Sequence, residues 1–278
     1  MTHIRYVPSP PLTFYIDYLY YLDGRMPYVH ETILPLPVLD LKINLGGAFK
    51  VYENGHADTF TEGWCVGLWK VPHMLDWPHD LRLFGVRFKP DGAYPFLQVS
   101  LSELRNRVVT LDAMWGRAAG ELRERLYAAP TIQAGFRLLE QFLQDHLSEA
   151  PPGLNVVRYG TTQVEQCHGV LSIRDLSDQI GISQNQLGRQ FQRFVGVSVK
   201  ELARLYRFET ILNMLDPTQP VEWTRIAHQT GYYDQSHLNK DFLAFTGHNP
   251  TDYLQFRRRT YLENPEHART HLRQLAID

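Results

Sequence analysis

The sequence of 278 residues has few of the features that mark membrane or secreted proteins. Its two cysteines, Cys65 and Cys167, lie too far apart in sequence to indicate a disulfide framework, so we expect buried reduced thiols. No apolar run approaches the ~20 residues that a helix needs to cross a bilayer. The first residues, MTHIRYVPSPPLTF, have no signal-peptide pattern. These absences predict a cytoplasmic protein without membrane contact.

The chain also lacks a strong basic excess, which would have favoured nucleic acid directly. Its net charge is −2 and its pI is about 6.6. Charge is slightly uneven, with 11 basic and 9 acidic residues over 168–260 against 15 basic and 18 acidic over 1–167. Because phosphate neutralisation supplies much of the affinity for DNA, this balance fits a DNA reader with few phosphate contacts, or one that dimerises.

The last third of the chain contains one pattern twice. Residues 173–202 and 223–254 align when Gly181 is paired with Gly231, and their apolar positions then follow the same spacing. Each copy predicts a short apolar helix, a glycine-containing turn and a second helix with apolar residues at i, i+4 and i+7. This is the sequence form of a helix-turn-helix, whose second helix can enter the DNA major groove. Two such units in tandem predict a protein that binds double-stranded DNA.

A long helix is predicted between the two copies. Ser198 with Glu201 forms a capping-box pattern that opens a helix running to about Leu215. A helix of roughly 17 residues is about 25 Å long, enough to hold two reading heads about one DNA turn apart. Before this all-helical region, the run Ala150-Pro151-Pro152-Gly153 breaks the pattern, and we place a domain boundary there.

The first ninety residues alternate short apolar runs with turn residues, which is typical of an antiparallel sandwich or barrel. The predicted strands are 14–22, 38–45, 49–52 and 81–88, and the predicted turns are 44–47, 53–55 and 90–92. From 93 to 148 the pattern becomes helical, including a stretch over 114–127. An apolar stripe along 132–147 predicts a helix that either covers the chain's own sheet or forms a dimer contact.

Together these patterns predict an α+β multidomain chain. An N-terminal antiparallel β-sandwich or barrel with flanking helices precedes a C-terminal all-α domain with a double helix-turn-helix. The expected ranges are a sensing or dimerisation domain over 1–150 (β-rich to about 92, helical over 93–148), a DNA-binding domain over 155–262, and a tail over 263–278 forming a loose or peripheral helix.

The second helix of each unit has a polar face opposite its apolar stripe. The outward residues are Gln184, Asn185, Gly188, Arg189 and Gln192 in the first unit and Gln235, Ser236, Asn239 and Lys240 in the second. Asparagine can pair bidentately with adenine, and arginine with guanine or phosphate. A single face of this kind is more often a solvated helix surface, but two matched faces on two matched motifs favour DNA contact.

The two motifs resemble a known family. The run IAxxxGYYDQSHLxxxFxxFTGxxPxxY at 226–253 resembles the second-motif signature of the AraC/XylS family of bacterial transcription regulators, and LSDQIGISQNQLGRQFQRFVGVS at 176–198 resembles the first. The resemblance covers about 155–260 and implies two reading heads joined by a long helix, with RNA polymerase as a partner. Gly188 departs from the family, which usually has a side chain able to reach a base there. First-unit recognition is therefore expected to be narrower.

The first half of the chain resembles, more loosely, a sensor domain of unknown ligand. The residues behind this resemblance are ILPLPVLDLKINLG at 33–46 and GVRFKPDGAYPFL at 85–97. The resemblance implies that this half binds an effector and dimerises. The protein would then be a transcription regulator that is controlled by a small molecule and that forms a homodimer. Seven aromatic residues of this half have two alternative roles. They either line an aromatic pocket or pack in the core, and core packing is the more common role of such side chains. They are Tyr15, Tyr18, Tyr20, Tyr21, Trp64, Trp69 and Trp77. Two other functions stay open: a constitutive DNA binder whose first half only dimerises, and an enzyme or carrier built on the N-terminal barrel.

Three other chemistries have little support in the sequence. A metal site is expected to have ligands closely paired in sequence. The four histidines of the sandwich region, His30, His56, His73 and His79, do not have this spacing. Two cysteines are too few for the reactive cluster of a DNA-repair protein. The pair Gly46-Gly47 lacks the following Lys-Ser/Thr pattern of a phosphate-binding loop. We therefore predict no catalytic residues, no metal and no cofactor.

Overall fold

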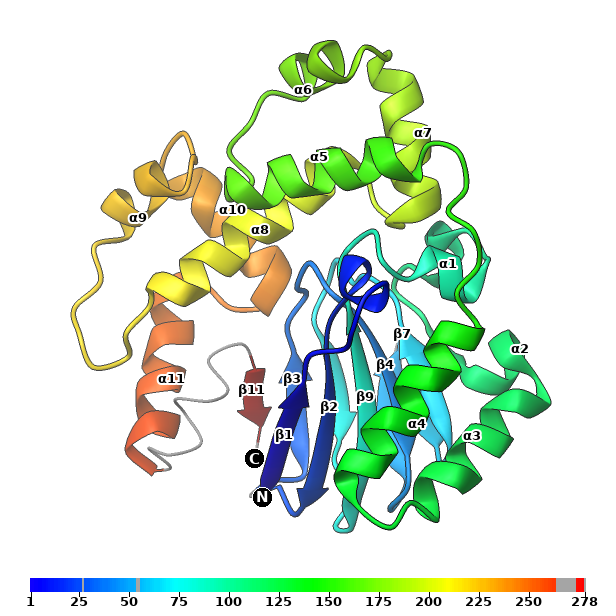
Figure 1. Ribbon diagram of the computed structural model, residues 1–278. Helices are drawn as coiled ribbons and strands as arrows, with labels where there is room; N and C mark the ends of the chain where they lie inside the picture. Colours follow the sequence, from blue (N-terminus) through cyan, green and yellow to red (C-terminus); the bar gives the residue numbers. More distant parts are fainter. Residues whose placement is uncertain (27, 54–55, 264–273, 278) are drawn as a thin grey trace.

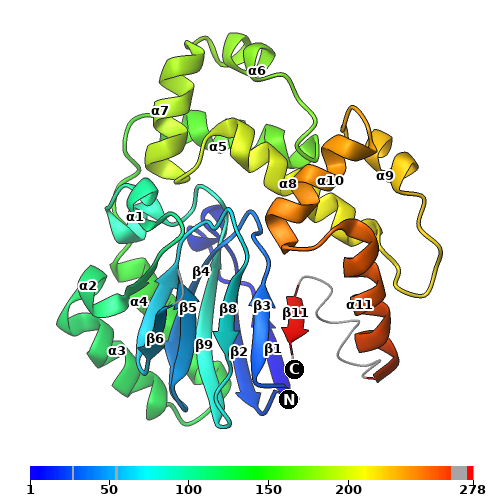
Figure 2. The same ribbon diagram turned by 180° about the vertical axis from the view of Figure 1, so that it is seen from behind.

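The N-terminal part of the chain folds as two facing β-sheets with helices on one side (Figures 1 and 2). The computed structural model describes residues 1–26, 28–53, 56–263 and 274–277. The first sheet has the order β1 (Thr2–Tyr6), β2 (Ile16–Gly24), β9 (Leu81–Phe88), β4 (Leu39–Asn44), β7 (Gly63–Val66), β10 (Val108–Thr110). The second has the order β11 (Gln274–Ile277), β3 (His30–Ile33), β8 (His73–Asp76), β5 (Phe49–Glu53), β6 (His56–Phe60). The arrangement is a sandwich, not a closed barrel.

The outer face of the first sheet is covered by three helices. They are α2 (Leu111–Trp115), α3 (Arg117–Tyr127) and α4 (Ile132–Asp145). Alternate residues of β4, such as Leu41, point into the core beneath these helices. Phe136 of α4 meets Phe84 of β9 edge-on, with ring centroids 5.3 Å apart. The apolar stripe of α4 therefore covers the chain's own sheet, and that stripe is not available for the dimer contact that we considered.

A second apolar core lies between the two sheets. It contains large aromatic side chains from both layers, including Phe49, Trp64 and Trp77. Of the seven aromatic residues singled out in the sequence, five are buried, namely Tyr20, Tyr21, Trp64, Trp69 and Trp77. Core packing is thus the main role of these rings.

The C-terminal part is helical and lies across one end of the sandwich (Figure 1). Its helices are α5 (Leu154–Gln166), α6 (Ile173–Ile180), α7 (Gln184–Phe194), α8 (Val199–Met214), α9 (Trp223–Gln229), α10 (Gln235–Thr246) and α11 (Pro250–Glu263). The predicted capping box opens α8, since the Ser198 hydroxyl accepts the Glu201 N–H and the Glu201 carboxylate accepts the Ser198 N–H. None of the helices in the described part of the chain is long and apolar enough to span a membrane.

Two segments of the sandwich reach into the cores of the helical part. Leu34, just after β3, is buried among residues of α8, α9 and α10. Leu68, just after β7, is buried among residues of α5, α7 and α8. Lys70 then pairs with Glu201 of α8. The buried Asp91 accepts hydrogen bonds from Arg158 Nε (3.1 Å) and Thr161 Oγ1 (3.0 Å) of α5. The sandwich is thus in contact with both halves of the helical part.

Several sequence expectations are corrected. Residues 12–14 form a 3-10 turn, so the strand expected over 14–22 begins at Ile16. The helix expected over 114–127 is broken at Gly116, whose φ of +55° ends α2 before α3 begins. The tail forms a strand over 274–277 that pairs with β3, where we expected a helix. The rest of the tail and most of the expected turn at 53–55 lie outside the described residues.

The cysteine prediction is half right. Cys65 is buried in the core of the first sheet, and burial raises the pKa of its thiol. Cys167 is exposed, because it follows the last residue of α5 at the surface. Both thiols are free.

Candidate nucleic-acid interface

The first unit, α6–α7, has the local geometry of a helix-turn-helix. Ser172 and Ser183 cap the two helices by accepting backbone N–H groups of Asp175 and Gln186, both at 3.2 Å. Gly181 ends α6 with φ +79°, and the aligned Gly231 has φ +74°. A left-handed residue is needed at both turns, which explains why glycine recurs there. On α7, Leu187, Phe191 and Phe194 are buried as predicted.

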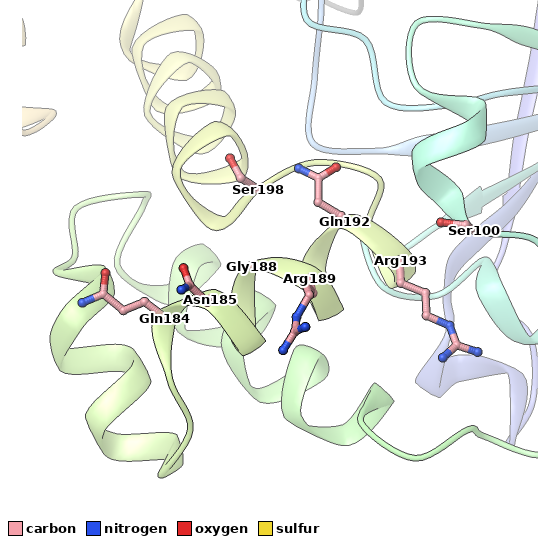
Figure 3. Close-up of a pocket in the computed structure, with 8 residues that line it drawn as sticks. All are labelled: Ser100, Gln184, Asn185, Gly188, Arg189, Gln192, Arg193 and Ser198. Carbon is pink, nitrogen blue, oxygen red and sulfur yellow. The ribbon is translucent and has the colours of Figure 1, made fainter.

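The opposite face of α7 is open to solvent. Gln184, Asn185 and Arg189 are exposed, while Gly188 and Gln192 are half-buried. Together these five residues line a shallow hollow of about 570 Å³ (Figure 3), which is completed by Ser100, Arg193 and Ser198. All the residues predicted in the first unit therefore lie around one surface feature.

Gly188 lies on the open surface of this hollow. A methyl group added at Gly188 would meet no other atom within 4 Å. A side chain at this position would extend into the hollow, so glycine leaves the hollow wider. Hydrogen-bonding side chains around it come from Gln184, Asn185, Arg189 and Gln192, while Gly188 supplies none. Narrower recognition by this unit, resting on Asn185 and Arg189, stays a prediction.

The N-terminal domain forms one edge of the hollow beside α7. Ser100 belongs to the segment that precedes the short helix η2 (Leu101–Leu104), and this segment packs beside α7. Arg193 near the end of α7 donates to the Tyr94 hydroxyl at 2.7 Å, and its guanidinium lies 5.3 Å from that ring's centroid. Sequence reasoning missed both contacts, since nothing in the local pattern links residues nearly a hundred positions apart.

The second unit, α9–α10, has a more strongly anchored reading helix. Asp234 caps α10 by accepting the His237 N–H at 2.7 Å. Ser236 and Lys240 are exposed, whereas Gln235 and Asn239 are half-buried. The Gln235 carbonyl oxygen already accepts a hydrogen bond from the Thr224 hydroxyl at 3.0 Å. Among the described residues, the buried Asn239 Oδ1 has no hydrogen-bond partner.

A buried acid, Asp241, attaches α10 to α8. Arg204 of α8 binds it with two nitrogens, at 3.0 and 2.7 Å, and the Tyr232 hydroxyl donates at 3.2 Å. The hydrogen bonds and charge of Asp241 raise the pKa of Arg204 against the opposing effect of burial. Sequence reasoning did not identify this residue. The sequence offers one indication of its role: helical periodicity places the acidic Asp241 next to the buried apolar stripe of α10.

A second residue missed by the sequence analysis is Tyr233. It lies in the turn before Asp234, and its side chain is 87% exposed. An aromatic side chain this exposed is unusual, because burying its apolar surface normally stabilises the folded state. It thus lies two residues before the start of α10.

Metal-dependent chemistry has no assembled ligand set in the described ranges. No group of three or more His, Cys, Asp or Glu side chains is placed there to hold a metal ion. His30 pairs with Asp76 (2.5 Å) on the sandwich, and His73 stacks on Trp69 with centroids 4.0 Å apart. His30 is thus paired with a carboxylate and His73 with an aromatic ring.

Comparison with known protein families supplies a name for the helical part. Residues 176–256 match the model of a helix-turn-helix domain. The C-terminal part is an AraC-type helix-turn-helix domain. The chain therefore carries a DNA-binding domain that points to a transcription regulator, as the sequence predicted. Residues 4–110 match a domain of unknown function (DUF6597).

Solved structures give more distant likenesses to the chain. ToxT from Vibrio cholerae, at 1.65 Å resolution, is 12% identical with a TM-score of 0.47, over 85% of this chain and 98% of that one. ToxT from strain O395 bound to (E)-4-(8-methylnaphthalen-1-yl)but-3-enoic acid is also 12% identical, with a TM-score of 0.44, over 85% and 98%. The AraC-like transcriptional activator CuxR is 12% identical with a TM-score of 0.23, over 69% and 73%. Among curated proteins, no significant match was found.

Proposed function

We propose that the chain reads two neighbouring segments of the DNA major groove, one with α7 and one with α10. The observation that carries this proposal is the pair of outward polar faces on the second helices of two units joined by α8 (Figure 1). Such faces offer the hydrogen-bonding side chains that direct readout requires. The 16 residues of α8 give a rod about 24 Å long, which suits two heads on one face of the duplex.

The proposed contacts are the nine residues predicted from the sequence. They are Gln184, Asn185, Gly188, Arg189, Gln192, Gln235, Ser236, Asn239 and Lys240. Exposed Asn185 and Arg189 suit base contact, and exposed Lys240 suits phosphate contact. For Gln235 and Asn239, half-burial means that a base contact requires their side chains to turn outward. Reading chromosomal DNA would place the protein in the bacterial cytoplasm.

The test is selection of DNA from a random pool with the full-length protein. We expect an enriched site with two short blocks about one helical turn (~10 base pairs) apart. The matched control is a double variant, Arg189→Ala with Lys240→Ala, which should lose the enrichment. Recovery of one block only would contradict the double reader, and equal enrichment by the double variant would contradict the assigned faces.

We further propose that the N-terminal sandwich controls DNA binding through a small-molecule effector. Its segments after β3 and β7 pack into the cores of the two units, so a ligand that favours one arrangement of these segments would change how the units are held. DNA affinity measured with and without members of a small-molecule library tests this. Unchanged affinity throughout would contradict effector control. Binding of RNA polymerase and homodimerisation remain predictions of the resemblance.

A constitutive DNA binder is the second candidate. The observation that favours it is the tight aromatic packing between the sheets, where Phe49, Trp64 and Trp77 meet. In that case the sandwich would only hold the two units in place. The ligand screen separates the two candidates, because only effector control predicts a ligand-dependent DNA affinity.

A further inference from the structure

The helical part has only a small excess of positive charge for a DNA-binding surface. Over 168–260 there are 11 basic and 9 acidic residues, a difference of two. Neutralisation of DNA phosphates by Lys and Arg supplies much of the affinity of DNA-binding proteins. Phosphate contacts from outside the helical part would therefore add to its affinity, and the sandwich is already attached to it.

One segment of the sandwich, residues 98–107, packs directly beside α7. A Cβ added at Gly196, in the turn after α7, would lie 2.6 Å from the Leu101 carbonyl oxygen, so the two backbones are in close contact. Just before the segment, the Tyr94 ring meets the Phe194 ring of α7 edge-on, with centroids 4.7 Å apart. We call residues 98–107 the flanking segment. Its backbone is held against the end of α7, so DNA that approaches this end also approaches the segment.

The flanking segment borders the outward face of α7 without covering it. Asn185 and Arg189 on that face are exposed. Ser100 of the segment and Arg193 of α7 both line the hollow beside them. Figure 3 shows Ser100 and Arg193 at one end of the hollow and Asn185 towards the other. The segment therefore lies at the side of the exposed face and leaves that face open to DNA.

A helix that lies in a major groove has DNA backbone close to it on both sides. The groove is about 12 Å wide, and a helix with its side chains is about 10–12 Å across. In a helix-turn-helix the N-terminal residues of the second helix contact the bases. The later residues of that helix, and any element fixed beside them, then lie near the phosphates. Ser100 and Arg193 have this position beside α7.

The chemical groups at this end of the hollow suit a phosphate. Arg193 is exposed, and among the described residues only one of its five N–H donors is used, in the hydrogen bond to the Tyr94 hydroxyl. Ser100 adds a hydroxyl, which lies 2.8 Å from the Ser102 hydroxyl. In the described part of the chain, Arg189 and Arg193 line the hollow and no carboxylate does. Guanidinium and hydroxyl groups are common partners of DNA phosphates.

We propose that the sandwich itself takes part in DNA binding. The DNA strand that borders the groove read by α7 crosses the hollow, and one of its phosphates is held between Ser100 and Arg193. This contact adds affinity without sequence preference, because it is made to the backbone. It rests on the proposed reading of the major groove by α7, and it makes the flanking segment part of the DNA-binding surface.

Opposite charges placed at Ser100 test the contact. The full-length protein is titrated with a fluorescent duplex of about 30 base pairs, roughly three helical turns, of scrambled sequence at low salt. Ser100→Lys should tighten binding and Ser100→Glu should weaken it, each about fivefold, as one charge close to a phosphate in water requires. Added salt should reduce both effects. Arg193→Ala should lower the dependence of log K on log salt concentration by about 1.

The matched controls make the same charge changes far from α7. They are Gln133→Lys and Gln133→Glu, at an exposed residue in the first turn of α4. This helix begins at the end of the sandwich that points away from α7 (Figure 1), so both controls should bind like the wild type. Misfolding would weaken both Ser100 variants, so a change of opposite sign in the two can come only from their charge.

Three results would overturn the contact. They are wild-type binding by both Ser100 variants, a change of the same sign in both, and equal effects at Ser100 and Gln133. Tighter binding by both Ser100 variants would mean that the flanking segment hinders DNA. A wild-type protein that binds no duplex would contradict the proposed function and this contact with it, whereas DNA binding that ignores charge at Ser100 contradicts the contact alone.

Discussion

The two helix-turn-helix units share a pattern but differ in how their reading helices are supported. In the first unit, α7 has exposed side chains around an open hollow, and the N-terminal domain forms one edge of it. In the second, α10 is joined to α8 by the buried Asp241, and part of its polar face is half-buried. The comparison teaches that one sequence motif supports two kinds of surface. One has exposed side chains around a hollow, and the other has a helix held by a buried ion pair, with part of its polar face half-buried.

The largest expected effect concerns the surroundings of the second unit. Glu31 of β3 is fully buried, which raises its pKa to about 7 against the hydrogen bonds of Trp77 and Tyr28 and the charge of Arg257 in α11. Between about pH 4.5 and 7 the folded state keeps a proton that the unfolded state releases, so stability should fall as pH rises through this window. The fall should approach about 3 kcal/mol. Urea unfolding across this range checks it, and Glu31→Gln should remove the part of the slope that Glu31 contributes.

The attachment of α10 offers the next largest effect. Asp241→Ala should lower the free energy of unfolding by ~2–3 kcal/mol, because it leaves the partly buried Arg204 and the Tyr232 hydroxyl without their partner. The aligned residue of the first unit is Gln190, which has no comparable network among the described residues. Gln190→Ala should cost less than about 1 kcal/mol. Equal losses in denaturant unfolding would show that the two units are supported alike.

DNA contacts should differ in kind between the units. Arg189→Ala should cost ~1–3 kcal/mol of binding and relax preference at one base pair, whereas Lys240→Ala should weaken all sequences alike and lower the salt slope by about 1. Titrations of a selected site and of scrambled DNA at several salt concentrations measure both. Arg117→Ala, at an exposed residue of α3, is the control. Unaltered binding by both variants would refute the assigned faces.

The smallest effect distinguishes two glycines. Gly188→Ala should raise the free energy of unfolding by up to ~1 kcal/mol, because alanine favours helix and the added methyl group meets nothing. Gly247→Ala, after α10, should lower it by about 1 kcal/mol, since its φ is +75°. Thermal unfolding of the two variants measures both signs. A lower free energy of unfolding for Gly188→Ala would mean that other atoms occupy the space beside Gly188 in solution.

Sequence patterns predicted some parts of this molecule much better than others. The strand over 81–88 and the buried stripes of α7 and α10 were predicted correctly, because each depends on local periodicity. Short polar strands such as β6, HADTF, were missed because their sequence has no apolar alternation, and pairing with the adjacent β5 forms the strand. The role of Asp241 was hidden for another reason, since its partner Arg204 lies on another helix, 37 positions away.

The start of α8 has a consequence for how the two parts of the chain separate. Glu201 binds Lys70 of the sandwich and also caps its own helix through Ser198. Although partial burial opposes its charge, these contacts hold the pKa of Glu201 below its usual value. If Lys70 moved away, the capping box would remain complete. Separation at this point would therefore leave the rod intact. The ion pair of Lys70 with Glu201 is partly exposed and would add only a small cost to that of exposing Leu68.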